Sequence, residues 1–199
     1  MNYPEVIRNL IECFKKLPGI GEKSAERLAL ATLKLDDEII NLFSQSLKDT
    51  KTKIKRCNIC NNLSEQDKCD ICLDENRNKK IICVVQEPKN VIMIEKSNNY
   101  NGMYHVIDNL ISPLDGINPS DINIGALKQR IEKDKVEEVI IALKQSIEGE
   151  TTTLYIAKIL ENTGVKITKI AQGIPYGTDM EYIDYLTLEK AIEDRKEIS

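Results

Sequence analysis

Four cysteines are the residues of this sequence whose types and spacing specify chemistry most directly. They form two Cys-x2-Cys pairs, Cys57 with Cys60 and Cys69 with Cys72, and eight residues separate the pairs. Two short loops of this kind can place four thiolates tetrahedrally around a zinc ion at roughly 2.3 Å. Because four cysteine ligands leave no coordination position for water or substrate, we predict one structural zinc ion per chain.

Disulfides and an iron-sulfur cluster are the alternative uses of this cysteine pattern. Disulfides would require an oxidising compartment, whereas residues 1–5 lack the basic region and apolar stretch of a secretion signal. The sequence also has no apolar run near the roughly 20 residues that span a bilayer. We therefore expect a cytoplasmic protein that does not enter membranes and keeps its thiols reduced.

The segment between the first and last cysteine has little apolar surface with which to fold. Its apolar anchors are Ile59, Leu63 and Ile71. These side chains are too few to offset the chain entropy of sixteen residues, so the metal must supply the difference. Lys55, Arg56 and Lys68 flank the site, where they could balance the negative charge of a zinc tetrathiolate or could face phosphate.

A second pattern is the turn Pro-Gly-Ile-Gly at residues 18–21, which separates two amphipathic stretches. Gly19 and Gly21 permit a sharp turn and the close approach of a ligand. The backbone amides at the start of the following helix would form an anion site, suited to phosphate. A plain helical hairpin without a ligand is the alternative interpretation.

The helix after this turn has one basic face. At 100° per residue, Arg27 lies 40° from Lys23, and Lys34 lies 20° from Lys23. The residues on the opposite side are apolar: Ala25, Leu28 and Ala29. We expect Lys23 and Arg27, with the backbone at Gly19 and Gly21, to carry DNA binding, although a solvated helix surface has the same pattern.

Two carboxylates, Glu148 and Glu150, follow an apolar stretch that we interpret as a strand. The C-terminal ends of strands are where α/β sheets build sites, and two such acids could bind Mg²⁺. The arrangement resembles the Asp-x-Asp element of Toprim domains. The place of the third Toprim acid reads Gln86-Glu87 here. A Mg²⁺-dependent nuclease that uses Glu87, Glu148 and Glu150 is therefore the rival hypothesis.

The elements that would position these groups can be read from hydrophobic periodicity. Three helices are expected first, over residues 5–17, from residue 22, and over residues 37–50. Four short apolar runs rich in β-branched residues predict strands over residues 81–85, 103–107, 139–143 and 165–170. Helical stretches alternate with them, near residues 88–96, 124–133 and 151–162. This alternation predicts parallel βαβ crossovers, and a last short helix is expected from Thr187.

Composition is that of a globular protein of one large or two small domains. The chain has 199 residues, of which 41% are hydrophobic and 30% are charged, and its net charge is −4. The charge is uneven, because residues 1–56 carry 11 Lys and Arg against 8 acids, whereas residues 57–199 carry 17 against 24. Phosphate binding is therefore expected in the N-terminal region.

Read in order, these motifs resemble the bacterial recombination mediators of the RecR family over nearly the whole chain. The resemblance rests on the helix-hairpin-helix sequence at residues 17–25, the four-cysteine finger, Ser-Pro-Leu-Asp-Gly at residues 112–116 and Ile-Glu-Gly-Glu-Thr at residues 147–151. It implies an α+β multidomain fold in four parts. These are a helix-hairpin-helix DNA-binding region at 1–56, a zinc finger at 57–72, a Toprim-like α/β domain with a mostly parallel sheet at 80–175, and a short C-terminal segment at 176–199.

The resemblance also implies a function. It implies a mediator without catalysis that binds DNA independently of sequence in recombinational DNA repair by the RecF pathway. The expected partners are RecO and RecF, the expected outcome is RecA loading at gaps, and the expected assembly is a homo-oligomer, either a dimer or a tetrameric ring around DNA. Glu148 and Glu150 are expected to contact a partner, because a basic surface on RecO would suit them.

Two loops depart from the family pattern. Residues 142–145 read Ala-Leu-Lys-Gln where the family usually has Ala-Thr-Asn-Pro. Gln172 stands where the family usually has a histidine. Both departures lie on the Toprim side, so they bear on partner contacts more than on zinc or DNA binding.

Overall fold

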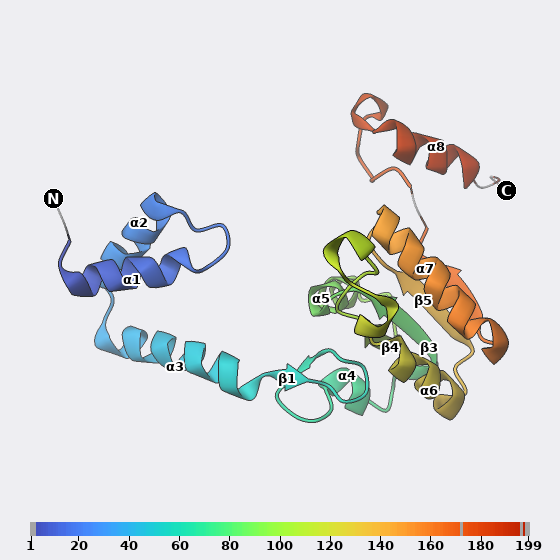
Figure 1. Cartoon of the computed structure of the whole chain (residues 1–199), viewed down its shortest axis with the longest axis horizontal. Coiled ribbons are helices and arrows are strands. Elements are labelled where there is room, and N and C mark those ends of the chain that lie inside the picture. Colours follow the sequence, from blue (N-terminus) through green and yellow to red (C-terminus); the bar gives the residue numbers. More distant parts are fainter. Residues whose placement is uncertain (1–2, 172, 196, 198–199) are drawn as a thin grey trace. The chain divides into compact units, whose positions relative to one another are not determined.

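The structure is a computed structural model that describes residues 3–171, 173–195 and 197. Gln172, at one of the two departures from the family pattern, lies outside the described residues. The chain divides into two compact units, Met1–Ile54 and Lys55–Ser199, which we describe separately. Figure 1 shows the elements of both units with their labels.

The first unit contains α1 (Glu5–Lys15), α2 (Glu22–Thr32) and α3 (Asp37–Lys53). The helices α1 and α2 form a hairpin around Ile11, Ala25 and Ala29, which are buried. The two alanines allow close approach of the helices because they have no side chain beyond Cβ. α1 ends two residues before the predicted residue 17, since Pro18 disfavours a helical backbone at Leu17.

The third helix of this unit, α3, has no buried residue. Its large apolar side chains are instead exposed: Ile39, Leu42, Phe43 and Leu47. The periodic pattern that predicted the helix was correct. Nothing in the described chain covers the apolar stripe fully, however, so α3 retains a surface suited to association.

The second unit begins with the cysteine-rich finger. Here β1 (Lys55–Arg56) pairs antiparallel with β2 (Leu63–Ser64), and a short helix α4 (Asp70–Leu73) follows. Sequence periodicity did not predict these elements, because two-residue strands and a four-residue helix are too short for a period. Residues 55 and 56, which we had grouped with the N-terminal region, belong to the paired strands of the finger.

The remainder of this unit is built on a four-stranded sheet with the order β4-β3-β5-β6, and every pair is parallel. The strands are β3 (Asn78–Val85), β4 (Gly102–Val106), β5 (Glu138–Ala142) and β6 (Lys166–Lys169). The crossover helices are α5 (Pro88–Lys96), α6 (Ile124–Asp134) and α7 (Ile147–Leu160). The predicted parallel α/β domain is therefore confirmed.

The core lies on both faces of this sheet because side chains alternate along β3. Ile82 and Val84 join the cluster formed with α6 and α7, whereas Cys83 and Val85 join the cluster formed with α5. Because helices cover both faces of the sheet, the sequences of the strands are continuous apolar runs. This arrangement also places the C-terminal ends of β3 and β5 side by side, as a doubly wound sheet requires.

Several element boundaries in this unit differ from those predicted, and β3 begins at Asn78 where residue 81 was expected. α7 begins at Ile147 and not near residue 151, because Ser146 caps it through a bond from the Gly149 amide. α8 (Tyr185–Glu193) begins two residues before Thr187, because the Asp184 side chain accepts from the Thr187 amide. The described residues also include four single-turn 3₁₀ helices: Pro113–Asp115, Pro119–Asp121, Glu161–Thr163 and Met180–Tyr182. No helix among the described residues is long and apolar enough to cross a membrane.

Candidate metal centre and nucleic-acid interface

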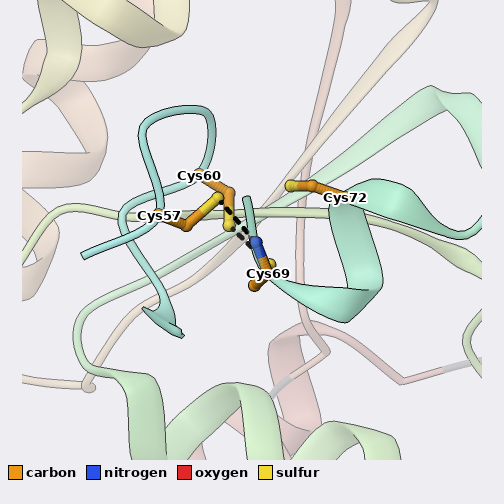
Figure 2. Close-up of side chains that lie close together, drawn as sticks. All are labelled: Cys57, Cys60, Cys69 and Cys72. Carbon is orange, nitrogen blue, oxygen red and sulfur yellow. Dashed lines mark hydrogen bonds between the residues drawn. The ribbon is translucent and has the colours of Figure 1, made fainter. Parts of the chain in front are cut away.

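The structure brings the four predicted cysteines together. Cys57 and Cys60 lie on the loop after β1, Cys69 is the N-cap of α4 and Cys72 lies within α4. Their sulfur atoms all lie within 4.8 Å of one another and point toward a common centre (Figure 2). Zinc with Zn–S bonds of roughly 2.3 Å needs sulfurs roughly 3.8 Å apart, so the four side chains fit a tetrahedral zinc ion.

The protonation of these thiols also fits a divalent cation. Hydrogen bonds among these thiols lower the pKa of Cys69 and raise the pKa values of Cys60 and Cys72. Four thiolates side by side repel one another, so a divalent cation is needed to hold them at this distance. The Cys69 amide also donates to the Cys57 sulfur at 3.3 Å, a contact that supports a thiolate ligand.

The finger is attached to the edge strand β4 by hydrogen bonds. The Val106 amide donates to the Cys60 carbonyl at 2.8 Å, and the Asn61 side chain donates to the Val106 carbonyl at 3.0 Å. Asn61 also donates to Asp108 at 2.6 Å, and Arg56 pairs with Asp108 at 2.7 Å. Metal binding at Cys60 is therefore coupled to the end of β4.

Two of the three basic residues beside the finger, Lys55 and Arg56, are engaged in ion pairs. Lys55 pairs with Asp67 at 2.6 Å, and Arg56 also donates to the Asn61 carbonyl at 3.0 Å. Of the two uses that the sequence left open for Lys55 and Arg56, structural support for the finger is the one these contacts favour. Asn61 and Asp108, both with positive φ, were not predicted from the sequence because their role depends on a contact 47 residues away.

The glycine turn of the hairpin has the geometry of an anion site. Gly19 has φ +81°, a conformation that favours glycine, whereas Gly21 has an extended backbone and is the N-cap of α2. A Cβ at Gly21 would meet nothing within 4 Å. Gly21 therefore leaves open space in front of the first α2 amides, which have no partner within the helix.

The basic face of α2 lies on an open hollow of about 470 Å³. Lys23, Arg27 and Lys34 all line this hollow. Helical geometry predicted the common face of Lys23 and Arg27, whereas Lys34 lies in the turn after α2 ends at Thr32. Their side chains make no hydrogen bond or ion pair with any described residue. They are available to phosphate, unlike Lys55 and Arg56.

The three glutamates of the rival nuclease hypothesis have other contacts. Glu87 caps α5 by accepting from its N3 amide, and it pairs with Lys89 at 2.7 Å. Glu148 and Glu150 lie in the first turn of α7, where Glu150 pairs with Lys169. Among the described residues, the only group of three or more potential ligands that could hold a metal ion is the four cysteines.

The first turn of α7 holds its two acids in a fixed geometry. Gly149 separates them, and a Cβ there would lie 1.8 Å from the Lys144 carbonyl, so this position requires glycine. A hydrogen bond from the Ser146 side chain lowers the pKa of Glu148. Glu148 is half-buried and Glu150 is exposed. Both are therefore available at the surface as negative charges.

The remaining histidine and cysteine side chains, which could also take part in chemistry, are buried in the core or lie apart from the metal centre. His105 is fully buried in β4, and its Nε2 donates to the Asn123 carbonyl at 2.6 Å. Cys83 is buried, and burial raises the pKa of its thiol to about 12, so it is inert. Cys13 lies on α1 and is exposed.

Fold and site together define an α+β protein in which a four-cysteine zinc finger joins a helical hairpin to a Toprim-type sheet. Four family models match the chain: the RecR helix-hairpin-helix at residues 7–51, the RecR four-cysteine zinc finger domain at 54–74, the Toprim domain at 80–171 and the RecR C-terminal segment at 173–196. The recombination protein RecR of Enterococcus faecalis is 46% identical over 198 residues and covers 100% of both chains. The chain belongs to the RecR family, and its finger is a structural zinc site.

Proposed function

We propose that this protein is a DNA-binding recombination mediator that has no catalytic activity of its own. In this proposal it acts in the cytoplasm in the RecF pathway of DNA repair, with RecO and RecF, to promote RecA loading at gaps. Family membership supports the mediator role. The single observation that carries DNA binding is a set of three cations, Lys23 and Arg27 on α2 and Lys34 in the turn after it, whose side chains have no partner among the residues that the structure describes.

The hairpin contact is sequence-independent in this proposal. Phosphate is bound by the α2 amides beyond Gly19 and Gly21 and by the side chains of Lys23 and Arg27. Each of these groups contacts the charged phosphate backbone, and none contacts a base edge in the grooves. The affinity should accordingly depend on salt and not on sequence.

The acids of α7 serve a partner in this proposal. Glu148 and Glu150 lie on an exposed first turn, and a protein with a basic surface, such as RecO, would meet them there. Neutralising both should weaken association with RecO and reduce its dependence on salt, while binding of DNA is retained.

Self-assembly as a dimer or a tetrameric ring completes the proposal. The exposed apolar stripe of α3 supports it, since such a stripe in a monomer favours association. The second unit has a comparable surface at α8, where Tyr185 and Leu186 are exposed. Light scattering during the binding experiment gives the assembly state that accompanies each affinity.

The experiment that tests the proposal measures binding to duplex, gapped and single-stranded DNA over a salt series. We expect binding to all three, with affinity falling as salt rises. Supercoiled DNA incubated with protein and Mg²⁺ should stay intact. Cleavage that disappears in Glu148→Gln and Glu150→Gln would establish the nuclease instead.

A further inference from the structure

Tyr3 lies just before α1 and lines two different hollows of the first unit. The first, of about 470 Å³, is the hollow that also contains Lys23, Arg27 and Lys34. The second, of about 540 Å³, is lined by residues of α1 and by the first turns of α2. Tyr3 is half-exposed, so part of its ring is open to solvent. An aromatic ring therefore lies beside the basic face of α2.

The two hollows differ in the charges of the side chains that line them. This difference determines which hollow can bind a polyanion such as DNA. Three cations and one acid, Glu26, line the first hollow. The second is lined by one cation, Arg8, and by four acids: Glu5, Glu12, Glu22 and Glu26. DNA that reaches Tyr3 must therefore approach over the first hollow, where phosphates are attracted and not repelled.

The first hollow is not lined by charge alone. Leu30 extends the apolar wall beside Tyr3, and Leu30 is the residue that interrupts the basic stripe of α2. A cationic groove with an aromatic face is the composition of sites that hold unpaired bases, because phosphates meet the cations while a base stacks on the ring.

We propose that this hollow receives an unpaired nucleotide whose base stacks on Tyr3 while Lys23, Arg27 and Lys34 hold the flanking phosphates. Glu26 can accept a hydrogen bond from an N–H group of the base, such as the N3–H of thymine. The proposal rests on the proposed DNA-binding function of the hairpin and names its ligand as a single-stranded segment. A paired base is stacked within its duplex and cannot enter, so Tyr3 should favour gapped or single-stranded DNA over continuous duplex.

The chain contains no tryptophan, which gives the proposal a direct optical test. Tyr3→Trp introduces a single indole into the hollow, and single-stranded oligothymidylate should quench its fluorescence by stacking. Continuous duplex of equal length should quench it far less. The matched control is Tyr176→Trp, which places the only indole at a fully exposed tyrosine of the second unit. Its fluorescence should change little with either DNA.

Affinity gives a second test that separates stacking from charge. Tyr3→Ala should weaken binding to oligothymidylate by roughly 5- to 150-fold, the range of one lost stacked base, and should leave the log-salt slope unchanged. Tyr3→Phe keeps the aromatic face and should bind as the parent does. Circular dichroism and thermal melting of each variant establish that the hairpin is folded.

The outcomes distinguish this inference from the proposed function on which it rests. Equal losses on single-stranded and duplex DNA, an unchanged affinity in Tyr3→Ala, or no quenching in Tyr3→Trp would overturn the stacking site. If Lys23→Ala and Arg27→Ala weaken binding in the same assays, the hairpin still binds DNA and only the stacking role fails. If neither changes binding, the hairpin site itself is wrong.

Discussion

The finger and the helical hairpin both carry basic residues, but they use them differently. In the finger, Lys55 and Arg56 pair with Asp67 and Asp108. In the hairpin, Lys23 and Arg27 have no partner within the described chain and face an open hollow. A basic side chain that has an ion-pair partner within the fold supports the structure, whereas one without such a partner is available to a ligand.

The same difference holds for backbone groups. In the finger, the Cys60 carbonyl accepts a hydrogen bond from the Val106 amide of β4, and the Asn61 side chain donates one to the Val106 carbonyl. These hydrogen bonds are made within the protein. The first amides of α2 have no partner within the helix, and a Cβ at Gly21 in front of them would meet nothing within 4 Å. Lys55 and Arg56 beside the finger are therefore less available to a ligand than Lys23 and Arg27 of the hairpin.

Loss of zinc should have the largest effect, because the finger cannot stay folded without the metal. We expect about one zinc per chain in the purified protein, and Cys57→Ser or Cys69→Ser should lose it. Structural zinc contributes roughly 10 to 16 kcal/mol in small fingers. Elemental analysis gives the metal, and hydrogen exchange should show lost protection in the finger and at the Val106 amide.

Cys83→Ser is the matched control, because Cys83 is buried in β3 and is not a member of the cluster. It should keep its zinc. Stoichiometric iron in the parent, or a fully protected finger without metal, would contradict a structural zinc site.

Acid should weaken the strand to which the finger is attached. Burial lowers the pKa of His105 from its ordinary value of 6.5 to about 4. The unfolded chain therefore takes up this proton more readily than the folded one, and stability falls as pH drops from about 6.5 toward 4. A shift of this size corresponds to roughly 3 kcal/mol.

Replacing His105 by glutamine tests this assignment, since a glutamine amide can still donate to the Asn123 carbonyl. Denaturant unfolding at several pH values should show a shallower loss of stability in His105→Gln than in the parent. The parent and His105→Gln contain the same cysteines, so effects of acid on the cysteines cancel when the two pH profiles are compared. Parallel pH profiles would show that His105 does not cause the loss.

The two glycines of the turn should separate folding from binding. Gly19→Ala places a side chain at φ +81° and should destabilise the first unit by about 1 to 2 kcal/mol. Gly21→Ala should change stability less, because its backbone is extended, yet it should weaken DNA binding by obstructing the α2 amides. Thermal melting and fluorescence anisotropy measure the two effects, and the reverse pattern would remove Gly21 from the interface.

The smallest effect on DNA is expected at the acids of α7. Glu148→Gln and Glu150→Gln remove negative charge without removing a phosphate contact, so DNA affinity should stay the same or rise slightly. Association with RecO, measured by calorimetry, should fall. A clear loss of DNA affinity in either variant would show that α7 belongs to the DNA surface.

Much of this architecture follows from sequence pattern. The four cysteines and the parallel sheet were predictable, because ligand spacing and runs of β-branched residues are local signals. The common face of Lys23 and Arg27 follows from the 3.6-residue period, whereas Lys34 lies beyond the end of α2. What the sequence could not provide depends on distant contacts.

The attachment of the finger to β4 is one example, since it joins Asn61 to Asp108. The place of Tyr3 beside α2 is another, because Tyr3 precedes the first helix and has no periodicity to assign its face. Glu87 illustrates a third kind of limit. Its identity suggested a metal ligand, and only the structure revealed its role as a helix cap with Lys89 as its ion-pair partner.

The most direct test of the account is the salt dependence of DNA binding in three matched double variants. They are Lys23→Ala with Arg27→Ala in the hairpin, Lys55→Ala with Arg56→Ala in the finger, and Lys128→Ala with Lys133→Ala on α6. Each removes two positive charges. The account predicts that the hairpin variant alone flattens the slope of log affinity against log salt, by roughly two units. An unchanged slope in the hairpin variant, with the finger variant flattened instead, would contradict it.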